Sequence, residues 1–116
     1  MTELEPVRVL ITGGAGQIGY VLAFRVANGD LFGNRPVILH LLEISPAMKT
    51  LEAVVMELND CAFPNLVDVI GTDDPAVAMK DVDVAFLIGS FPKKPTTKTD
   101  DYLLRNVTIL SKTLKF

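Results

Sequence analysis

Apolar residues in this chain fall into short continuous runs that alternate with longer segments in which they recur every three or four positions. Val7–Thr12 is a β-branched run that ends at glycines, and Val37–Leu42 is almost wholly apolar. The second run is typical of a strand covered on both faces. Between the two runs, four apolar residues recur at helical spacing: Ile18, Val21, Leu22 and Val26. The pattern predicts a strand, a tight turn, a helix and a second buried strand.

The segment after the second strand predicts another helix that ends near Asp60. Ser45 and Pro46 stand where a helix N-cap and a first helical residue are expected. The apolar positions that follow have the spacing of a single helix face: Leu51, Val54, Val55 and Leu58.

Two more strands and two more helices are expected in the rest of the chain. Val67–Ile70 and Val82–Ile88 are the strand candidates, and Asp73–Pro75 predicts a helix start between them. A polar stretch that reaches Asp100 precedes a closing helix. Its apolar residues share one face: Leu103, Val107, Leu110 and Leu114.

The turn after the first strand contains a glycine pattern that satisfies G-x-G-x-x-G. The pattern follows a predicted strand and opens a predicted helix, which is the context of a dinucleotide-binding turn. Glycines let the main chain approach a diphosphate, and the helix dipole with its unpaired amides favours negative charge. The amides of Gly16, Gln17 and Ile18 are the expected principal donors; a turn without ligand is the alternative. The residues predicted to form this site are Gly13, Gly14, Ala15, Gly16, Gln17, Ile18 and Gly19.

Glu43 closes the second strand, at the position where an acid accepts hydrogen bonds from adenosine ribose hydroxyls. A carboxylate at this position also repels a 2′-phosphate. We therefore expect NAD rather than NADP as the cofactor. The alternative interpretation is that Glu43 only interacts with the dipole of the following helix.

The alternation of strands and helices predicts an α/β fold with a Rossmann-like, doubly wound parallel sheet, because right-handed crossovers join successive parallel strands. About four strands are accounted for, whereas such a sheet normally has about six when it binds a dinucleotide. At 116 residues the chain is also short for a complete two-domain enzyme. Residues 1–116 are thus expected to be the N-terminal part of a dinucleotide-binding domain, with its second half and a substrate domain absent.

Composition narrows the range of partners. The net charge of −3 and the absence of a basic stripe argue against a nucleic-acid partner. The longest apolar run, Val84–Ile88, is far too short to span a bilayer. A single cysteine, Cys61, and the lack of a secretory signal favour a reducing cytoplasm.

Three residue types that often carry chemistry are interpreted here as structural. His40, the one histidine, lies inside the apolar second strand and is expected to be a hydrogen-bonded core imidazole rather than a general base. Cys61 is expected to be a small buried apolar residue. Asp73 and Asp74 are expected to cap the following helix. The sequence predicts neither a catalytic residue nor a metal site.

Five segments follow one another over roughly residues 7 to 110: VRVLITGGAGQIGY, NGDLFG, HLLEISPAM, VVMELNDCAFP and DVDVAFLIGSFP. In this order and spacing they resemble the cytosolic-type malate dehydrogenases of the lactate/malate dehydrogenase superfamily. MELNDCAFP is the most specific of them, since it lies outside the glycine turn and has no role in binding a diphosphate there. The resemblance implies a homodimeric enzyme that oxidises malate to oxaloacetate with NAD.

The resemblance also assigns roles to individual residues. Gly89 would let the nicotinamide ribose pass close to the end of the fourth strand, and Asn106 would contact the cofactor. Two substrate-binding arginines of the family align with Lys94 and Thr99. Lysine offers a point charge and threonine none, so binding of a dicarboxylate should be weaker, or the substrate should be a different 2-hydroxy acid. The catalytic histidine of the family lies beyond the end of this chain, which should therefore be inactive alone.

Two other classes of protein are considered. The first is a non-catalytic module that binds NAD or forms dimers. The second is a sugar-nucleotide epimerase or short-chain reductase, because the segment ITGGAGQIG also resembles the opening turn of those enzymes. Those enzymes need a tyrosine followed four positions later by lysine. Here Tyr20 is followed at that spacing by Phe24, and Tyr102 by Asn106, so the second class fits less well.

Overall fold

Strands and helices alternate along the chain as the sequence predicts. The computed structural model describes residues 5–90 and 98–114. Its strands are β1 (Val7–Thr12), β2 (Val37–Leu42), β3 (Leu66–Thr72) and β4 (Val84–Leu87). Its α-helices are α1 (Gln17–Ala27), α2 (Met48–Asp60), α3 (Pro75–Met79) and α4 (Thr99–Leu114), and Ser45–Ala47 forms a 3-10 turn.

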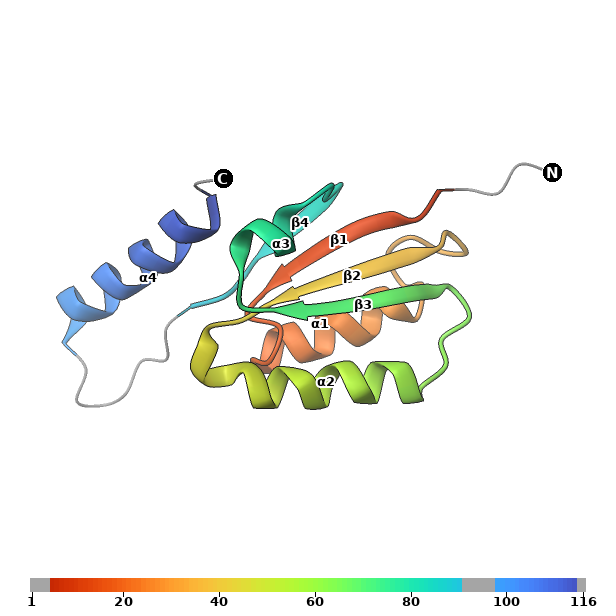
Figure 1. The fold of residues 1–116 in the computed structure, drawn as a ribbon, viewed down its shortest axis with the longest axis horizontal. Helices are drawn as coiled ribbons and strands as arrows, with labels where there is room; N and C mark the ends of the chain where they lie inside the picture. Colours follow the sequence, from red (N-terminus) through yellow and green to blue (C-terminus); the bar gives the residue numbers. More distant parts are fainter. Residues whose placement is uncertain (1–4, 91–97, 115–116) are drawn as a thin grey trace.

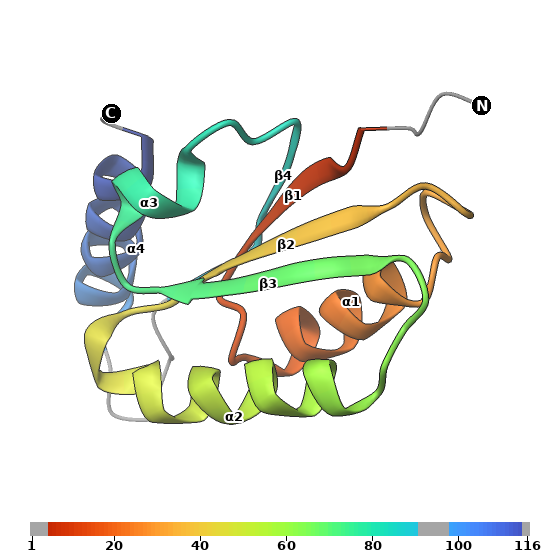
Figure 2. The same ribbon diagram turned by 45° about the vertical axis from the view of Figure 1, so that its right-hand side comes forward.

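The four strands form one parallel sheet in the order β3-β2-β1-β4. The helices α1 and α2 cover one face, and α3 and α4 lie on the other side (Figures 1 and 2). Right-handed crossovers require this arrangement, because the chain first moves from β1 towards β3 and then returns to place β4 beside β1. The predicted α/β, doubly wound Rossmann-like fold is confirmed, with the direction of strand order reversing between β1 and β4.

The register of β1 and β2 divides the core between the two faces. Val9 pairs with Leu39 and Ile11 with Leu41, and all four side chains are fully buried in the larger apolar cluster beneath α1 and α2. Alternate residues point to the opposite face. There they form a smaller cluster with α3: Leu10, Leu42 and Ala78.

The apolar stripe predicted for the first helix is partly wrong. Ile18 is 72% exposed and Val21 is 56% exposed, although Val26 is buried. The buried face is made mainly of small residues: Gly19, Ala23, Val26 and Ala27. Small side chains let α1 pack close to the sheet, and the buried face is consequently rotated away from Ile18 and Val21.

The start of the second helix also differs from the prediction. Ser45 begins the 3-10 turn, and neither that turn nor α2, which starts at Met48, has a side-chain N-cap. The predicted end at Asp60 is confirmed, and Leu51, Val54 and Leu58 are buried.

Cys61 is exposed, so the prediction that it is buried is wrong. It is the C-cap of α2, and Ala62 next to it has a left-handed φ of 52°. The chain leaves the helix at the surface here, which keeps the thiol out of the core.

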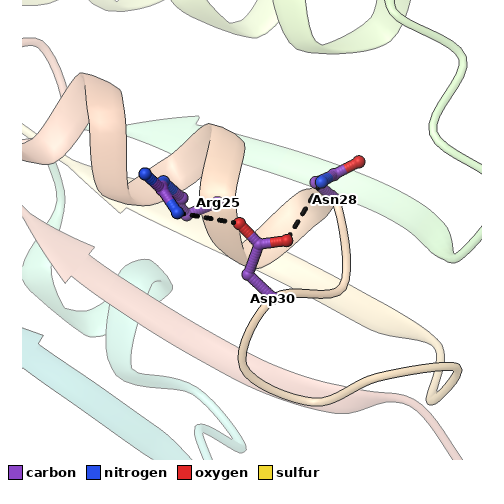
Figure 3. A network of polar contacts seen from close by, with 3 residues as sticks. All are labelled: Arg25, Asn28 and Asp30. Atoms are coloured by element: carbon purple, nitrogen blue, oxygen red, sulfur yellow. Dashed lines mark hydrogen bonds and ion pairs between the residues drawn. The ribbon is translucent and has the colours of Figure 1, made fainter.

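The connection between α1 and β2 contains a small polar network (Figure 3). Asp30 accepts hydrogen bonds from Arg25 at 3.4 Å and from Asn28 at 3.0 Å. The Arg25 side chain is 67% exposed, so its ion pair contributes less than about 1 kcal/mol. This network lies at the C-terminal end of α1, away from the glycine turn, and orders the loop rather than a site.

His40 is a hydrogen-bonded core residue, as the sequence predicts. It is 1% exposed, and its Nδ1 lies 2.8 Å from the carbonyl oxygen of Ala78. Its Nε2 lies 3.2 Å from Nη1 of Arg8. Because guanidinium only donates, Nε2 accepts and Nδ1 donates, which requires a neutral imidazole.

We expect His40 to make the folded state less stable as the pH falls below 6.5, its ordinary pKa. Burial lowers the pKa of His40, and the charge of Arg8 lowers it further. The hydrogen bond to Ala78 and the charges of Asp68 and Asp81 raise the pKa, but the net shift is downward. The unfolded chain therefore takes up this proton first. The contribution of His40 to stability is complete above pH 6.5 and declines as the pH falls towards the lower folded-state pKa.

Urea unfolding at about pH 5.5 and about pH 7.5 measures this effect. The control is His40→Gln, which cannot titrate, so its stability should change less between the two conditions. An equal loss of stability in both proteins would show that other groups cause the pH dependence.

None of the helices among residues 5–90 and 98–114 has the length and apolar character that a membrane span requires.

Candidate nucleotide-binding site

A groove lies at the carboxyl ends of β1, β2 and β4, where parallel sheets of this class bind ligands. Its volume is about 570 Å³. The glycine turn forms one side, and Glu43, Ile44 and Gly89 contribute from the neighbouring strand ends. The structure therefore brings together Glu43, Gly89 and most of the predicted turn residues, although these segments are distant in sequence.

The glycine turn is held by backbone hydrogen bonds. Gly13 and Gly14 both donate to the carbonyl oxygen of Leu42, at 2.9 and 3.2 Å. The Gly16 amide donates to the carbonyl oxygen of Gly13 at 2.9 Å. In this structure the turn itself uses the Gly16 amide, and the role of Gly16 as a principal diphosphate donor stays a prediction.

Two of the glycines are required by close approach of backbone segments. A Cβ on Gly19 would lie 2.1 Å from the carbonyl oxygen of Gly13. A Cβ on Gly13 would lie 2.7 Å from the Cα of Gly89, and Gly13 also has a left-handed φ of 72°. The first helix can therefore start directly over β1 only if these positions lack side chains.

The N-terminus of α1 supplies hydrogen-bond donors to the groove. The Tyr20 amide donates to the carbonyl oxygen of Gly16 at 2.8 Å, which is an i to i−4 bond at the start of the helix. The amides of Gln17, Ile18 and Gly19 precede it and have no α-helical acceptor. All three residues line the groove, where the positive end of the helix dipole favours an anion.

Glu43 connects the glycine turn to the end of β2. One carboxylate oxygen, Oε2, accepts from the Ala15 amide at 3.1 Å, and Oε1 accepts from the Ile44 amide at 3.0 Å. The residue is half-buried and faces the groove. Each carboxylate oxygen has a second lone pair, so the hydroxyls of a ribose could still be accepted.

A second pocket of about 320 Å³ adjoins the groove and shares lining residues with it, among them Gly13, Glu43 and Gly89. Sequence reasoning did not assign a binding role to several residues that line it: Ser45, Pro46, Asp73, Pro75, Ser90 and Thr108. Most of these lie just beyond the carboxyl ends of β2, β3 and β4. The rule that ligands bind outside these strand ends was the signal that could have found them.

Gly89 lines both pockets. Its amide donates to Oγ1 of the buried Thr12 at 2.9 Å, which fixes the end of β4 against β1. Asn106 is half-buried on α4, where Thr108 lines the smaller pocket. Thr99 is exposed at the first residue of α4, and Lys94 lies outside the described residues.

The sequence of residues 7–115 matches the family described as lactate/malate dehydrogenase, NAD binding domain. The chain belongs to this family. As a lactate/malate dehydrogenase domain it binds NAD, and the glycine-lined helix N-terminus and the acid at the end of β2 fit that cofactor. Family membership decides against the epimerase and short-chain reductase alternatives. No group of three metal-binding side chains occurs among the residues that the structure describes.

Solved structures of similar proteins include both lactate and malate dehydrogenases. A Trichomonas vaginalis lactate dehydrogenase in complex with NADH and oxamate is 48% identical, with a TM-score of 0.84, and the match covers 95% of this chain and 34% of that one. A malate dehydrogenase from Naegleria fowleri is 40% identical, with a TM-score of 0.88, and the match covers 97% and 35%. The chain thus spans about a third of the length of these relatives.

Proposed function

We propose that this domain is the NAD-binding part of a malate dehydrogenase. Malate is supported by the resemblance of the segments that include MELNDCAFP and by the 40% identity to a malate dehydrogenase. The observation that carries the NAD-binding role is the Glu43 carboxylate, which faces the groove while bound to the glycine turn. The amides of Gln17 and Ile18 would hold the diphosphate, Glu43 the adenosine ribose, and Gly89 would leave room for the nicotinamide ribose. When bound, NAD supplies the acceptor for a hydride from a 2-hydroxy acid.

The proposed substrate is the dicarboxylate pair of malate and oxaloacetate, with Lys94 selecting the distal carboxylate. Lactate and pyruvate form the second candidate pair, which is favoured by the 48% identity to a lactate dehydrogenase and by the uncharged Thr99. A lysine can attract a carboxylate, although without the paired geometry of arginine.

Initial rates of NADH oxidation by the full-length polypeptide distinguish the two substrates. We expect kcat/KM for oxaloacetate to exceed that for pyruvate by roughly ten-fold, and Lys94→Ala to remove most of this preference. Lys98→Ala, at an exposed lysine four positions later in the sequence, is the matched control and should keep this preference. A preference for pyruvate in the unaltered protein would replace malate by lactate in the proposal.

We also propose that the complete protein is a cytoplasmic homodimer. The support is the resemblance of the segments around the glycine turn and MELNDCAFP to a homodimeric family. Light scattering of the full-length polypeptide measures the oligomeric state, and a monomer at micromolar concentration would contradict the proposal.

The 116-residue chain by itself is expected to bind NADH without turning over a 2-hydroxy acid. The one histidine is 1% exposed, and both ring nitrogens contact protein groups, so His40 cannot serve as a general base in the groove. A titration followed by NADH fluorescence tests binding, and an absorbance assay with malate and NAD tests turnover. Turnover above background would show that the chain has a base which we have not identified.

A further inference from the structure

The loops that follow β2 and β3 are joined by one side-chain hydrogen bond at the smaller pocket. Ser45 Oγ donates to Asp73 Oδ2 at 2.9 Å, and both residues line the pocket of about 320 Å³. We propose that Asp73 is a positioning residue that, through Ser45, holds the wall of the pocket that receives the adenosine end of NAD. This inference rests on the proposed roles of the glycine turn and Glu43.

Ser45 makes this bond in place of the one that its position in the sequence predicts. A serine before a helix normally accepts from a backbone amide of the first turn, and losing that cap costs about 1 kcal/mol. Here the turn at Ser45 and the helix that begins at Met48 both lack a side-chain cap. The hydroxyl instead binds a residue from another strand end, so it stabilises the pocket wall rather than the helix.

The carboxylate of Asp73 is likewise not used by the helix that follows it. The neighbouring Asp74 caps α3 by accepting from the Ala76 amide at 3.0 Å, and the Asp74 amide donates to Oγ1 of Thr72. The two adjacent acids therefore have separate roles. Asp74 starts α3, and Asp73 is available to Ser45.

The hydrogen bond between Ser45 and Asp73 completes a series of contacts that hold the wall of the smaller pocket. The backbone of β2 and β3 stays paired as far as the Glu43 amide, which donates to the carbonyl oxygen of Thr72 at 3.1 Å. Beyond this point the segments that follow β2 and β3 separate around the smaller pocket. The Glu43 carboxylate holds the Ile44 amide on one side, and Asp73 holds Ser45 on the other, so the wall formed by Ile44 and Ser45 is fixed from both ends.

The test compares Ser45→Ala, Asp73→Ala and the double variant in the full-length polypeptide. We expect each single change to weaken binding of 5′-AMP and of NADH by roughly five-fold, and the double variant to bind no more weakly than either single one. KM for NADH should rise while kcat stays unchanged, because neither residue contacts the reacting end of the cofactor. Asp73→Asn retains an oxygen that accepts from Ser45 and should bind within about two-fold of the unaltered protein.

The matched control is Asp30→Ala, which removes another exposed carboxylate that accepts side-chain hydrogen bonds. Asp30 follows the C-terminal end of α1, whereas the glycine turn precedes the N-terminal end of that helix. The control should leave 5′-AMP binding unchanged. The positioning role is wrong, and the proposed function stands, if the unaltered protein binds NADH but the Ser45 and Asp73 variants bind 5′-AMP as tightly as the unaltered protein does. The same conclusion follows if the losses of affinity in the two single variants add in the double variant. If the unaltered protein binds neither ligand, both the proposed function and this inference fail.

Discussion

Replacing Gly19 with alanine is expected to lower the free energy of unfolding by about 3 kcal/mol or more and to weaken NADH binding by roughly 100-fold. The new Cβ would lie 2.1 Å from the carbonyl oxygen of Gly13 and 2.9 Å from its carbonyl carbon. These are backbone atoms of a turn fixed by hydrogen bonds to Leu42, so the clash can be relieved only if α1 moves away from β1. That movement would displace the Gln17 and Ile18 amides from the diphosphate position.

Gly71→Ala is the matched control for this prediction. A Cβ at Gly71 would lie 3.0 Å from a methyl carbon of Val55, and its other near contacts are side-chain atoms of Leu51. These side chains can shift slightly, and Gly71 is exposed in the edge strand β3, so the control should change stability by less than about 1 kcal/mol. Thermal unfolding and NADH fluorescence titration measure both effects. Normal NADH affinity in Gly19→Ala would show that the turn does not bind the diphosphate.

Changing Glu43 to glutamine should weaken NADH binding by roughly ten-fold to 100-fold. The carboxylate accepts from the Ala15 and Ile44 amides through its two oxygens. Glutamine has one oxygen, so its amide nitrogen would face a backbone donor, and the negative charge would be lost. Because that charge repels a 2′-phosphate, the preference for NADH over NADPH should also decrease.

Glu57→Gln is the control for charge on the same side of the sheet. Glu57 accepts one side-chain hydrogen bond, from the Tyr20 hydroxyl at 2.6 Å, and is exposed outside the glycine-lined groove. Its NADH affinity should stay within about two-fold of the unaltered protein. Equal affinities of the Glu43→Gln variant and the unaltered protein would exclude Glu43 as the ribose acceptor and leave it as a structural link between the turn and β2.

Local sequence pattern was sufficient for most of the fold. The bounds of β1 and β2 agree with the runs Val7–Thr12 and Val37–Leu42, which are mostly apolar because central parallel strands are buried on both faces. The strand β3 is longer than the predicted Val67–Ile70, and β4 is shorter than the predicted Val82–Ile88. Both are edge strands of this sheet. Val69 is the one buried residue of β3, and exposure alternates along β4, so no continuous buried run marks the ends of either strand.

The sequence located the glycine turn and Glu43, which the structure brings to one groove, because their signals are local. The glycine turn and Glu43 could be found because a diphosphate needs a close backbone approach at a helix N-terminus, and the adenosine ribose needs an acid at the end of the next strand. Whether Gly89 and Asn106 contact NAD, and whether Lys94 and Thr99 contact substrate, stays a prediction.

The amino-acid sequence by itself determined the order of strands and helices, the position of the glycine turn and the acid that follows β2, since each depends on neighbours along the chain. Only the tertiary structure decided which face of α1 is buried, that Gly16 serves the turn, that Cys61 is exposed, and that Ser45 meets Asp73. These features depend on packing and hydrogen bonds between segments that are distant in sequence. Periodicity and spacing carry no information about such contacts.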